Sequence, residues 1–219
     1  SLIFLRPLPG VDRPAIGTLL PTSAGATLML DAGANVDCKP RHLQQFARLG
    51  HIYAQDLMGV ERPRIGLLNI GEEPEKGDEL ALETHALLSR TAGINFVGNV
   101  EGREIIRGGC DVLVCDGFVG NVLLKFYESV AEFIIGLLHR EMARTGTRID
   151  VEGAFRVLDY AEYGGAPLLG VNGVTIICHG ASPPKAIGNA LGVASRAVRT
   201  RMVQHVAGEL SRDAAEPSG

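Results

Sequence analysis

Several features that mark other protein classes are missing from this chain. Tryptophan is absent and aromatic residues make up 5% of the sequence, which argues against a surface that stacks nucleic-acid bases. The formal net charge is −4 and no cluster of basic residues occurs, so we expect no nucleic-acid partner. The four cysteines form no Cys-x-x-Cys pair, which favours reduced thiols in a cytoplasmic protein.

The sequence also has no long spanning segment and no familiar catalytic motif. The longest stretch free of Lys, Arg, Asp and Glu, 163–184, is interrupted by glycines and prolines and cannot be one membrane-spanning helix. Dinucleotide, P-loop, zinc-protease and nucleophile-elbow motifs are all missing. Glu72, Glu73 and Glu75 are adjacent, but they precede a predicted helix and would offset its dipole. This reading is favoured over a metal site for these three acids.

The clearest positive feature is the stretch 109–121. Val112 to Cys115 is an uninterrupted apolar run, typical of a strand covered on both faces. Gly117 and Gly120 then allow a tight turn and a close backbone approach to a ligand. Asn121 follows at the expected start of a helix, where unpaired backbone N–H groups favour anions.

In the rest of the chain, expected β-strands alternate with expected α-helices. This alternation predicts a three-layer αβα, Rossmann-like domain with a mainly parallel sheet. The expected strands are 15–20, 27–30, 64–69, 94–97, 112–115 and 174–178, and the expected helices are 40–58, 78–91, 121–144, 151–158 and 183–206. Residues 163–170 read as a loop. We expect one domain over 1–210, a helical hairpin over 121–158 within it, and a frayed tail over 211–219.

Polar and glycine residues follow several of the expected strands. In a parallel sheet the carboxyl ends of the strands share one edge, where ligands bind. These strand exits are predicted to form one site, although turn chemistry alone explains each exit taken singly. They are 31–35, Asn69 with Gly71, Gly98 with Asn99, Asp116 with Gly117, Gly120 and Asn121, and His179 with Gly180.

Four side chains at these exits have two readings each. Lys76 lies just before a helix start, where a cation is locally unfavourable, so it is either functional or a solvated lysine paired with a nearby Glu. Asn121 is either an N-cap or a donor to a carbonyl or phosphate oxygen. His179 reads as a core histidine or a catalytic one. Cys115 reads as a small buried hydrophobe rather than a nucleophile.

Five motifs in order resemble the PlsX family, the bacterial phosphate acyltransferases of phospholipid synthesis. The resemblance runs from about Leu5 to Val206. The motifs are Leu-Leu-Asn69-Ile-Gly71-Glu-Glu with Lys76-Gly77, Asn95-Phe-Val-Gly98-Asn99-Val-Glu101, Val114-Cys-Asp116-Gly-Phe-Val-Gly120-Asn121, Tyr163-Gly-Gly-Ala-Pro-Leu-Leu-Gly170, and His179-Gly180.

The resemblance implies transfer of a long-chain acyl group from acyl carrier protein to inorganic phosphate. It also implies a fold related to phosphotransacetylases and isocitrate-type dehydrogenases, a homodimer, peripheral membrane association in the cytoplasm, and no metal or organic cofactor. Lys76 and Asn121 match the family's catalytic lysine and asparagine. Asn69, Gly71, Gly98, Asn99, Asp116, Gly117, Gly120, His179 and Gly180 then become substrate-binding candidates.

The chain departs from the family pattern in three places. It starts in mid-pattern without Met, so we expect a fragment that lacks the family's glycine-rich N-terminal segment. Ala181 stands where family members often have serine, and Asp78 where they often have asparagine.

The implied mechanism needs no protein nucleophile, because phosphate attacks the thioester itself. Lys76 would neutralise the phosphate or the oxyanion, Asn121 would donate to the carbonyl oxygen, and N–H groups at Gly71, Gly98 and Gly120 could cradle the phosphate. The hairpin's apolar face could meet a membrane or a second subunit, or pack on the sheet. The alternatives are a phosphotransacetylase that uses a short-chain acyl-CoA, and a non-catalytic membrane scaffold.

Overall fold

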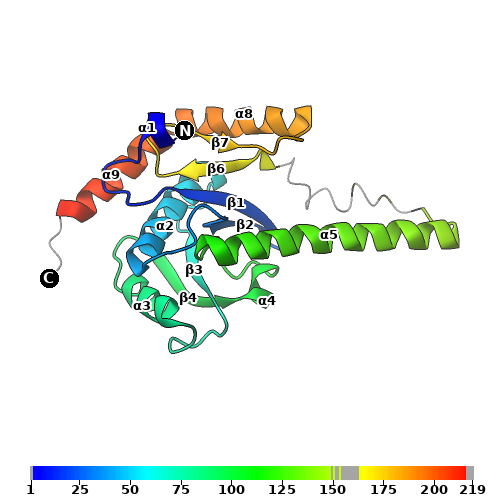
Figure 1. Ribbon diagram of the computed structural model, residues 1–219, viewed down its shortest axis with the longest axis horizontal. Helices are drawn as coiled ribbons and strands as arrows, with labels where there is room; N and C mark the ends of the chain where they lie inside the picture. The colour runs from blue at the N-terminus through cyan, green and yellow to red at the C-terminus, as the bar shows by residue number, and fades with distance from the viewer. Residues whose placement is uncertain (1, 149, 151–152, 154–162, 216–219) are drawn as a thin grey trace.

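The computed structural model describes residues 2–148, 150, 153 and 163–215 and shows helices on both faces of one mixed sheet (Figure 1). The strands are β1 (Ala15–Thr22), β2 (Gly25–Leu30), β3 (Arg64–Asn69), β4 (Asn95–Glu101), β5 (Val112–Val114), β6 (Ala166–Leu169) and β7 (Ile176–Ile177). The helices are α1 (Leu2–Leu5), α2 (Pro40–Tyr53) with its π-helical extension η1 (Ala54–Met58), α3 (Glu79–Leu88), α4 (Gly102–Ile105), α5 (Gly117–Thr145), α8 (Pro184–Arg199) and α9 (Met202–Ala215).

The sheet has the order β4-β3-β5-β2-β1-β6-β7. Strands β4, β3, β5 and β2 are parallel, whereas the β1–β2, β1–β6 and β6–β7 pairs are antiparallel. The carboxyl ends of β2, β3 and β5 therefore meet at one edge. The predicted αβα class is confirmed. The predicted strand exits after β2, β3 and β5 belong to the parallel part of the sheet.

Two hydrophobic clusters occupy the two faces of the sheet. The larger cluster joins β2, β3 and β5 to α2 and α9, with Phe46 and Leu49 fully buried. The smaller cluster lies under α4 and the beginning of α5, and includes Met29, Leu113 and Cys115. Alternate residues of β5 face opposite clusters, so the run at 112–114 is apolar without a break because both faces of the strand are covered.

Several predicted boundaries are wrong, and each error has a local cause. Strand β4 continues through Gly98 to Glu101, because Val97 is looped out of register and Gly98 takes a φ of 98°. The predicted loop 163–170 contains β6. The final helix breaks at Arg201, whose φ is 55°, and α9 then continues to Ala215, so the first part of the predicted frayed tail is helical.

Helix α5 is the most protruding element of the fold (Figure 1). Its 29 residues correspond to a rod on the order of 40 Å long, and only Gly117 and Gly120 are buried. The predicted return helix of the hairpin, 151–158, lies outside the described residues. Among the residues that are described, no helix has both the length and the apolar character needed to cross a membrane.

Candidate active site

The predicted site residues divide between two edges of the sheet. Asn69, Asp116 and the turn after β2 lie together at the carboxyl edge, because β3 and β2 both pair with β5 in parallel. His179 and Gly180 do not join them. Strand β7 is antiparallel to β6 and its Ile177 pairs with Ala166, the first residue of β6. The strand exit at His179 therefore lies at the opposite edge, and the prediction that all the exits share one edge is wrong for this pair.

A buried carboxylate organises the turn that follows β2. Asp31 is fully buried and its Oδ1 accepts hydrogen bonds from the backbone N–H groups of Ile16 at 2.9 Å and Ala34 at 3.1 Å. Its Oδ2 accepts from the backbone N and the Nδ2 of Asn35, at 2.7 and 2.8 Å. These four bonds offset the cost of removing a charge from water and fix the turn against the sheet.

The first turn of α5 packs directly on this turn. The backbone N–H of Gly117 donates to the carbonyl of Asn35 at 2.7 Å. A Cβ on Gly120 would lie 1.9 Å from the carbonyl oxygen of Asp31, and one on Gly117 would lie 2.7 Å from that of Asn35. The close approach predicted for these glycines is thus filled by the protein's own backbone and not by a ligand.

Helix α5 starts four residues earlier than predicted. Asp116 is the N-cap, and its Oδ1 accepts from the N–H groups of Phe118 at 2.8 Å and Val119 at 3.0 Å. The N–H of Gly120 donates to the Asp116 carbonyl, so Gly120 cannot help to cradle a phosphate. Asn121 lies within the helix and is not an N-cap.

Asn121 lies in α5, close to the turn that follows β2. The side chain lies beside Gly33, where an added Cβ would approach the Asn121 Cγ to 3.5 Å. Asn121 is exposed, and its amide makes no hydrogen bond with any residue that the structure describes. An amide on α5 that lacks a partner among the described residues can donate to an external oxygen.

Lys76 lies in the loop that joins β3 to α3. The Nδ2 of Asn69 donates to the Lys76 carbonyl at 2.9 Å, and Asn69 Oδ1 accepts from the N–H of Ile70 at 2.8 Å. Gly71 packs closely against Lys76, because an added Cβ would lie 2.8 Å from the Lys76 Cγ and would require that side chain to shift. Asn69 and Gly71 thereby shape the loop that carries Lys76.

The Lys76 ammonium has no carboxylate within ion-pair distance in the described part of the chain. The neighbouring Glu72 instead contacts Arg103, at 3.8 Å. Lys76 is therefore an exposed cation that forms no ion pair with any residue the structure describes, and the reading that pairs it with a nearby Glu is wrong. The side chain is available to an anion.

Asn99 supports the same loop from the neighbouring strand. It is 7% exposed and lies inside β4, opposite Leu67, not at the strand exit as predicted. Its Nδ2 donates to the Glu73 carbonyl at 2.7 Å, and its buried Oδ1 has no hydrogen-bond partner among the described residues.

A cavity of about 610 Å³ opens between the exits of β3 and β5 and the first turns of α3 and α5. Its floor is formed by buried residues that include Leu43, Leu67 and Cys115. The predicted residues Asn69 and Asp116 also line it, whereas Leu80 and Ala81 of α3 and Val119 of α5 were not anticipated. The only sequence signal for these three is apolar character in a helical first turn.

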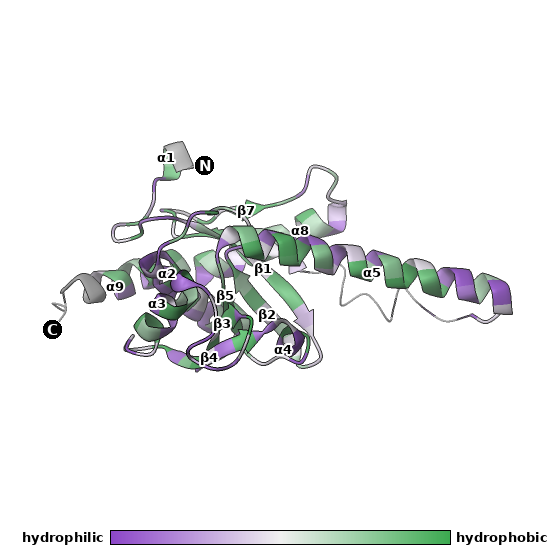
Figure 2. Ribbon diagram, turned by 60° about the horizontal axis from the view of Figure 1, so that its bottom comes forward, coloured by the Kyte–Doolittle hydropathy of each residue, from purple (hydrophilic) through white to green (hydrophobic). Residues whose placement is uncertain are grey.

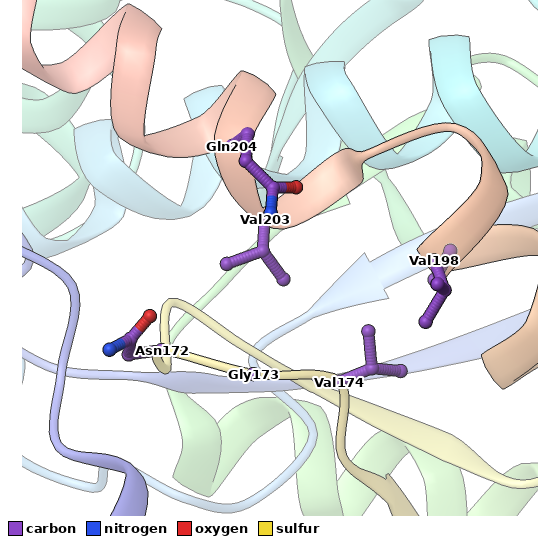
Figure 3. A pocket seen from close by; sticks show the side chains of 7 residues that line it. Asn172, Gly173, Val174, Val198, Val203 and Gln204 are labelled. Carbon is purple, nitrogen blue, oxygen red and sulfur yellow. The ribbon is translucent and has the colours of Figure 1, made fainter.

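A separate cavity of about 310 Å³ lies between the segment that joins β6 to β7 and the junction of α8 and α9 (Figure 3). Asn172, Val174, Val198 and Val203 point toward this space. None of the predicted site residues lines it.

The cysteine in the site is not poised for nucleophilic attack. Cys115 is 4% exposed, and burial raises the pKa of its thiol, with the charges of Asp116 and Asp31 acting in the same direction. A thiol whose pKa is raised carries almost no thiolate at neutral pH. The reading of Cys115 as a buried hydrophobe is confirmed.

Comparison with solved structures shows the class of fold first. The chain is similar to a structure titled EutD phosphotransacetylase from Staphylococcus aureus, with a TM-score of 0.59 at 15% identity, covering 89% of this chain and 57% of that one. A branched-chain phosphotransacylase from Enterococcus faecalis gives a TM-score of 0.51 at 16% identity, covering 85% and 66% of the two chains. At these identities the likeness establishes the fold alone.

Sequence comparison then identifies the family. Residues 1–205 match the family model described as "Fatty acid synthesis protein", and the chain belongs to this family, as its resemblance to PlsX proteins predicts. It is 53% identical to a protein named "Phosphate acyltransferase" from Desulforamulus reducens, covering 97% of this chain and 66% of the relative. A relative of the same name from a Synechococcus strain is 50% identical, covering 96% and 59%. The chain thus spans about 59–66% of the length of these relatives.

Proposed function

We propose that the protein transfers a long-chain acyl group from acyl carrier protein to inorganic phosphate, giving an acyl phosphate for phospholipid synthesis. The observation that carries the proposal is that the Lys76 ammonium and the Asn121 amide, which follow the adjacent strands β3 and β5, have no partner among the described residues. The name of the relatives supports the same reaction.

The chemistry requires charge stabilisation more than a protein nucleophile. A phosphate oxygen attacks the thioester carbonyl, a C–O bond forms, the C–S bond breaks, and the thiol group leaves as a thiolate. Lys76 would neutralise the phosphate, and the Asn121 amide would donate to the oxyanion as it develops. The inert thiol of Cys115 is consistent with direct attack by phosphate.

The proposal is tested by measuring acyl-phosphate formation from palmitoyl carrier protein and phosphate. We expect Lys76→Ala and Asn121→Ala each to lower the rate by about 100- to 1000-fold, because each removes a group that stabilises developing charge. The matched control is Lys125→Ala, since Lys125 is exposed on α5 and pairs with Glu128. Near-normal rates in folded Lys76 and Asn121 variants would contradict the assignment. Acetyl-CoA as donor tests the alternative short-chain phosphotransacetylase activity.

We further propose that the protein is a homodimer that contacts the membrane peripherally through the region around α5. The support is the apolar side chains of α5 that the described residues leave exposed, among them Phe126 and Phe133 at 66% and 63%. Figure 2 shows apolar bands along the part of α5 that extends beyond the body of the protein. Packing against the sheet, the simplest prediction for this face, does not occur over most of the helix.

A further inference from the structure

The cavity beside Lys76 differs in character from the rest of the site. Lys76 itself is exposed, but the cavity next to it extends inward to a floor in which Leu43 and Leu67 are 2% and 1% exposed. Its volume of about 610 Å³ lies within the range of pockets that enclose a small organic ligand, roughly 300–1,000 Å³.

The polar side chains that line this cavity are already engaged with the protein backbone. Both ends of the Asn69 amide hold the loop of Lys76. Asp78 caps α3 by accepting from the N–H of Ala81 at 2.8 Å, and Asp116 caps α5 by accepting from Phe118 and Val119. The side chains of Asn69, Asp78 and Asp116 therefore stabilise the loop and the two helix starts around the cavity.

This arrangement disfavours two of the three chemical parts of the proposed substrates. A phosphate dianion in the cavity would face the carboxylates of Asp78 and Asp116, with unfavourable charge repulsion. The amides of a pantetheine arm would find few free polar groups in this lining, because both ends of the Asn69 amide and one oxygen of each carboxylate are already bonded. A hydrocarbon chain needs neither, and it gains free energy by leaving water.

Resting on the function proposed above, we infer that this cavity is the acyl-chain subsite and that its occupant is the long saturated chain of the donor. Asn69 and Gly77 line the cavity on the side of the Lys76 loop, so the thioester would remain near Lys76 while the chain enters. Ile70 and Val119 line the opening and are 81% and 41% exposed. They form an apolar rim for a ligand that arrives from solution.

The substitution Ala81→Phe tests the inference because Ala81 is half-buried in α3 and lines the cavity. We expect the added ring to occupy space that a long chain needs, and to lower the rate with palmitoyl carrier protein on the order of tenfold or more. The rate with butyryl carrier protein should stay close to that of the wild type. Ala86→Phe is the matched control, since Ala86 lies on the same helix, is exposed and is not part of the cavity.

A binding assay gives a readout that does not depend on catalysis. Wild-type protein should bind cis-parinaric acid, a fluorescent long-chain fatty acid, and palmitate but not butyrate should displace it. Ala81→Phe should weaken this binding, whereas Ala86→Phe should not. If Ala81→Phe fails to fold, Val119→Phe on α5 replaces it, with Val130→Phe as its control outside the cavity.

The outcomes separate this inference from the function on which it rests. If wild-type protein makes no acyl phosphate from any donor, the proposed function fails. If it makes acyl phosphate but the cavity variants slow long and short donors equally, or slow neither, the acyl-chain assignment is overturned. Loss that grows with chain length, together with weaker parinaric acid binding, supports it.

Discussion

At the residue scale, the pairing of Arg64 with Asp111 ties two adjacent strands together at the edge opposite the site. Asp111 Oδ2 accepts from the backbone N of Arg64 at 2.8 Å and its Oδ1 from the Arg64 guanidinium at 3.0 Å. Burial acts to raise the pKa of Asp111, but the hydrogen bonds and charge of Arg64 outweigh it and hold this pKa below its usual value.

This lowered pKa makes a prediction about acid stability. A carboxyl whose pKa is lower in the folded state stabilises the fold above its unfolded pKa, about 4, and this contribution is lost as the pH falls through the folded pKa. Asp111→Asn should cost on the order of 1 kcal/mol at neutral pH, because the pair is partly exposed to solvent, and should flatten the fall of the unfolding free energy below about pH 4. Urea unfolding at a series of pH values measures both effects.

The control for that experiment is Asp37→Asn. Asp37 is exposed, and its carboxylate has no ion pair with the residues that the structure covers. Its loss should leave both stability and pH dependence nearly unchanged. An Asp111→Asn variant with the pH profile of the wild type would disprove the argument.

Lys76 could be identified as a candidate from the sequence because its positive charge is unfavourable at its position. Lys76 precedes a helix start, where a cation is unfavourable, and it forms no ion pair within the described part of the chain. His179 was misplaced because the direction of β7 depends on its pairing with β6. The residues around a short strand do not determine the direction in which that strand joins the sheet.

At the element scale, the start of α5 is fixed by contact between two backbones. Gly120→Ala would place a Cβ 1.9 Å from the Asp31 carbonyl oxygen, a backbone atom that cannot rotate away. We expect a loss of about 1–3 kcal/mol in unfolding free energy and displacement of Asn121, with lower acyl-phosphate formation. Thermal or urea unfolding and the activity assay measure the two effects.

Gly136 provides the matched control within the same helix. A Cβ there meets nothing within 4 Å, so Gly136→Ala should stabilise the helix by up to about 1 kcal/mol, through helix propensity alone. If both substitutions had the same effect, helix propensity and not packing on Asp31 would explain the result.

Helix termini were predicted with uneven success, for a physical reason. Pro40 begins α2, and Gly59 ends its π-helical extension with a φ of 74°, as the sequence predicts. The start of α5 was placed at Asn121, because Asn and Asp are both good N-caps. The contact of Gly117 and Gly120 with the turn after β2 decided in favour of Asp116.

At the scale of the whole molecule, the proposed membrane contact depends on the exposed apolar side chains of α5. We expect the protein to float with liposomes of anionic phospholipid, and a Leu137→Gln, Leu138→Gln double variant to float less, because apolar area that enters the bilayer is lost. His139→Gln on the same helix is the control. Sedimentation shows whether the double variant also dissociates a dimer.

The two proposed roles of this face have different signatures. Lost flotation with an unchanged mass assigns this part of α5 to the membrane, and a smaller mass with unchanged flotation assigns it to the dimer. If neither property changes, Leu137 and Leu138 belong to neither contact.

The sequence by itself determined the alternation of strands and helices, the buried strand at 112–114, the absence of familiar nucleophile motifs, and the importance of Lys76 and Asn121 as candidates. These follow from local periodicity and residue chemistry, which neighbouring residues carry. The tertiary structure alone decided that His179 lies at the other edge, that Gly117 and Gly120 receive protein backbone, and that an apolar cavity lies beside Lys76. Those features depend on which distant segments come into contact, and no local pattern encodes that contact.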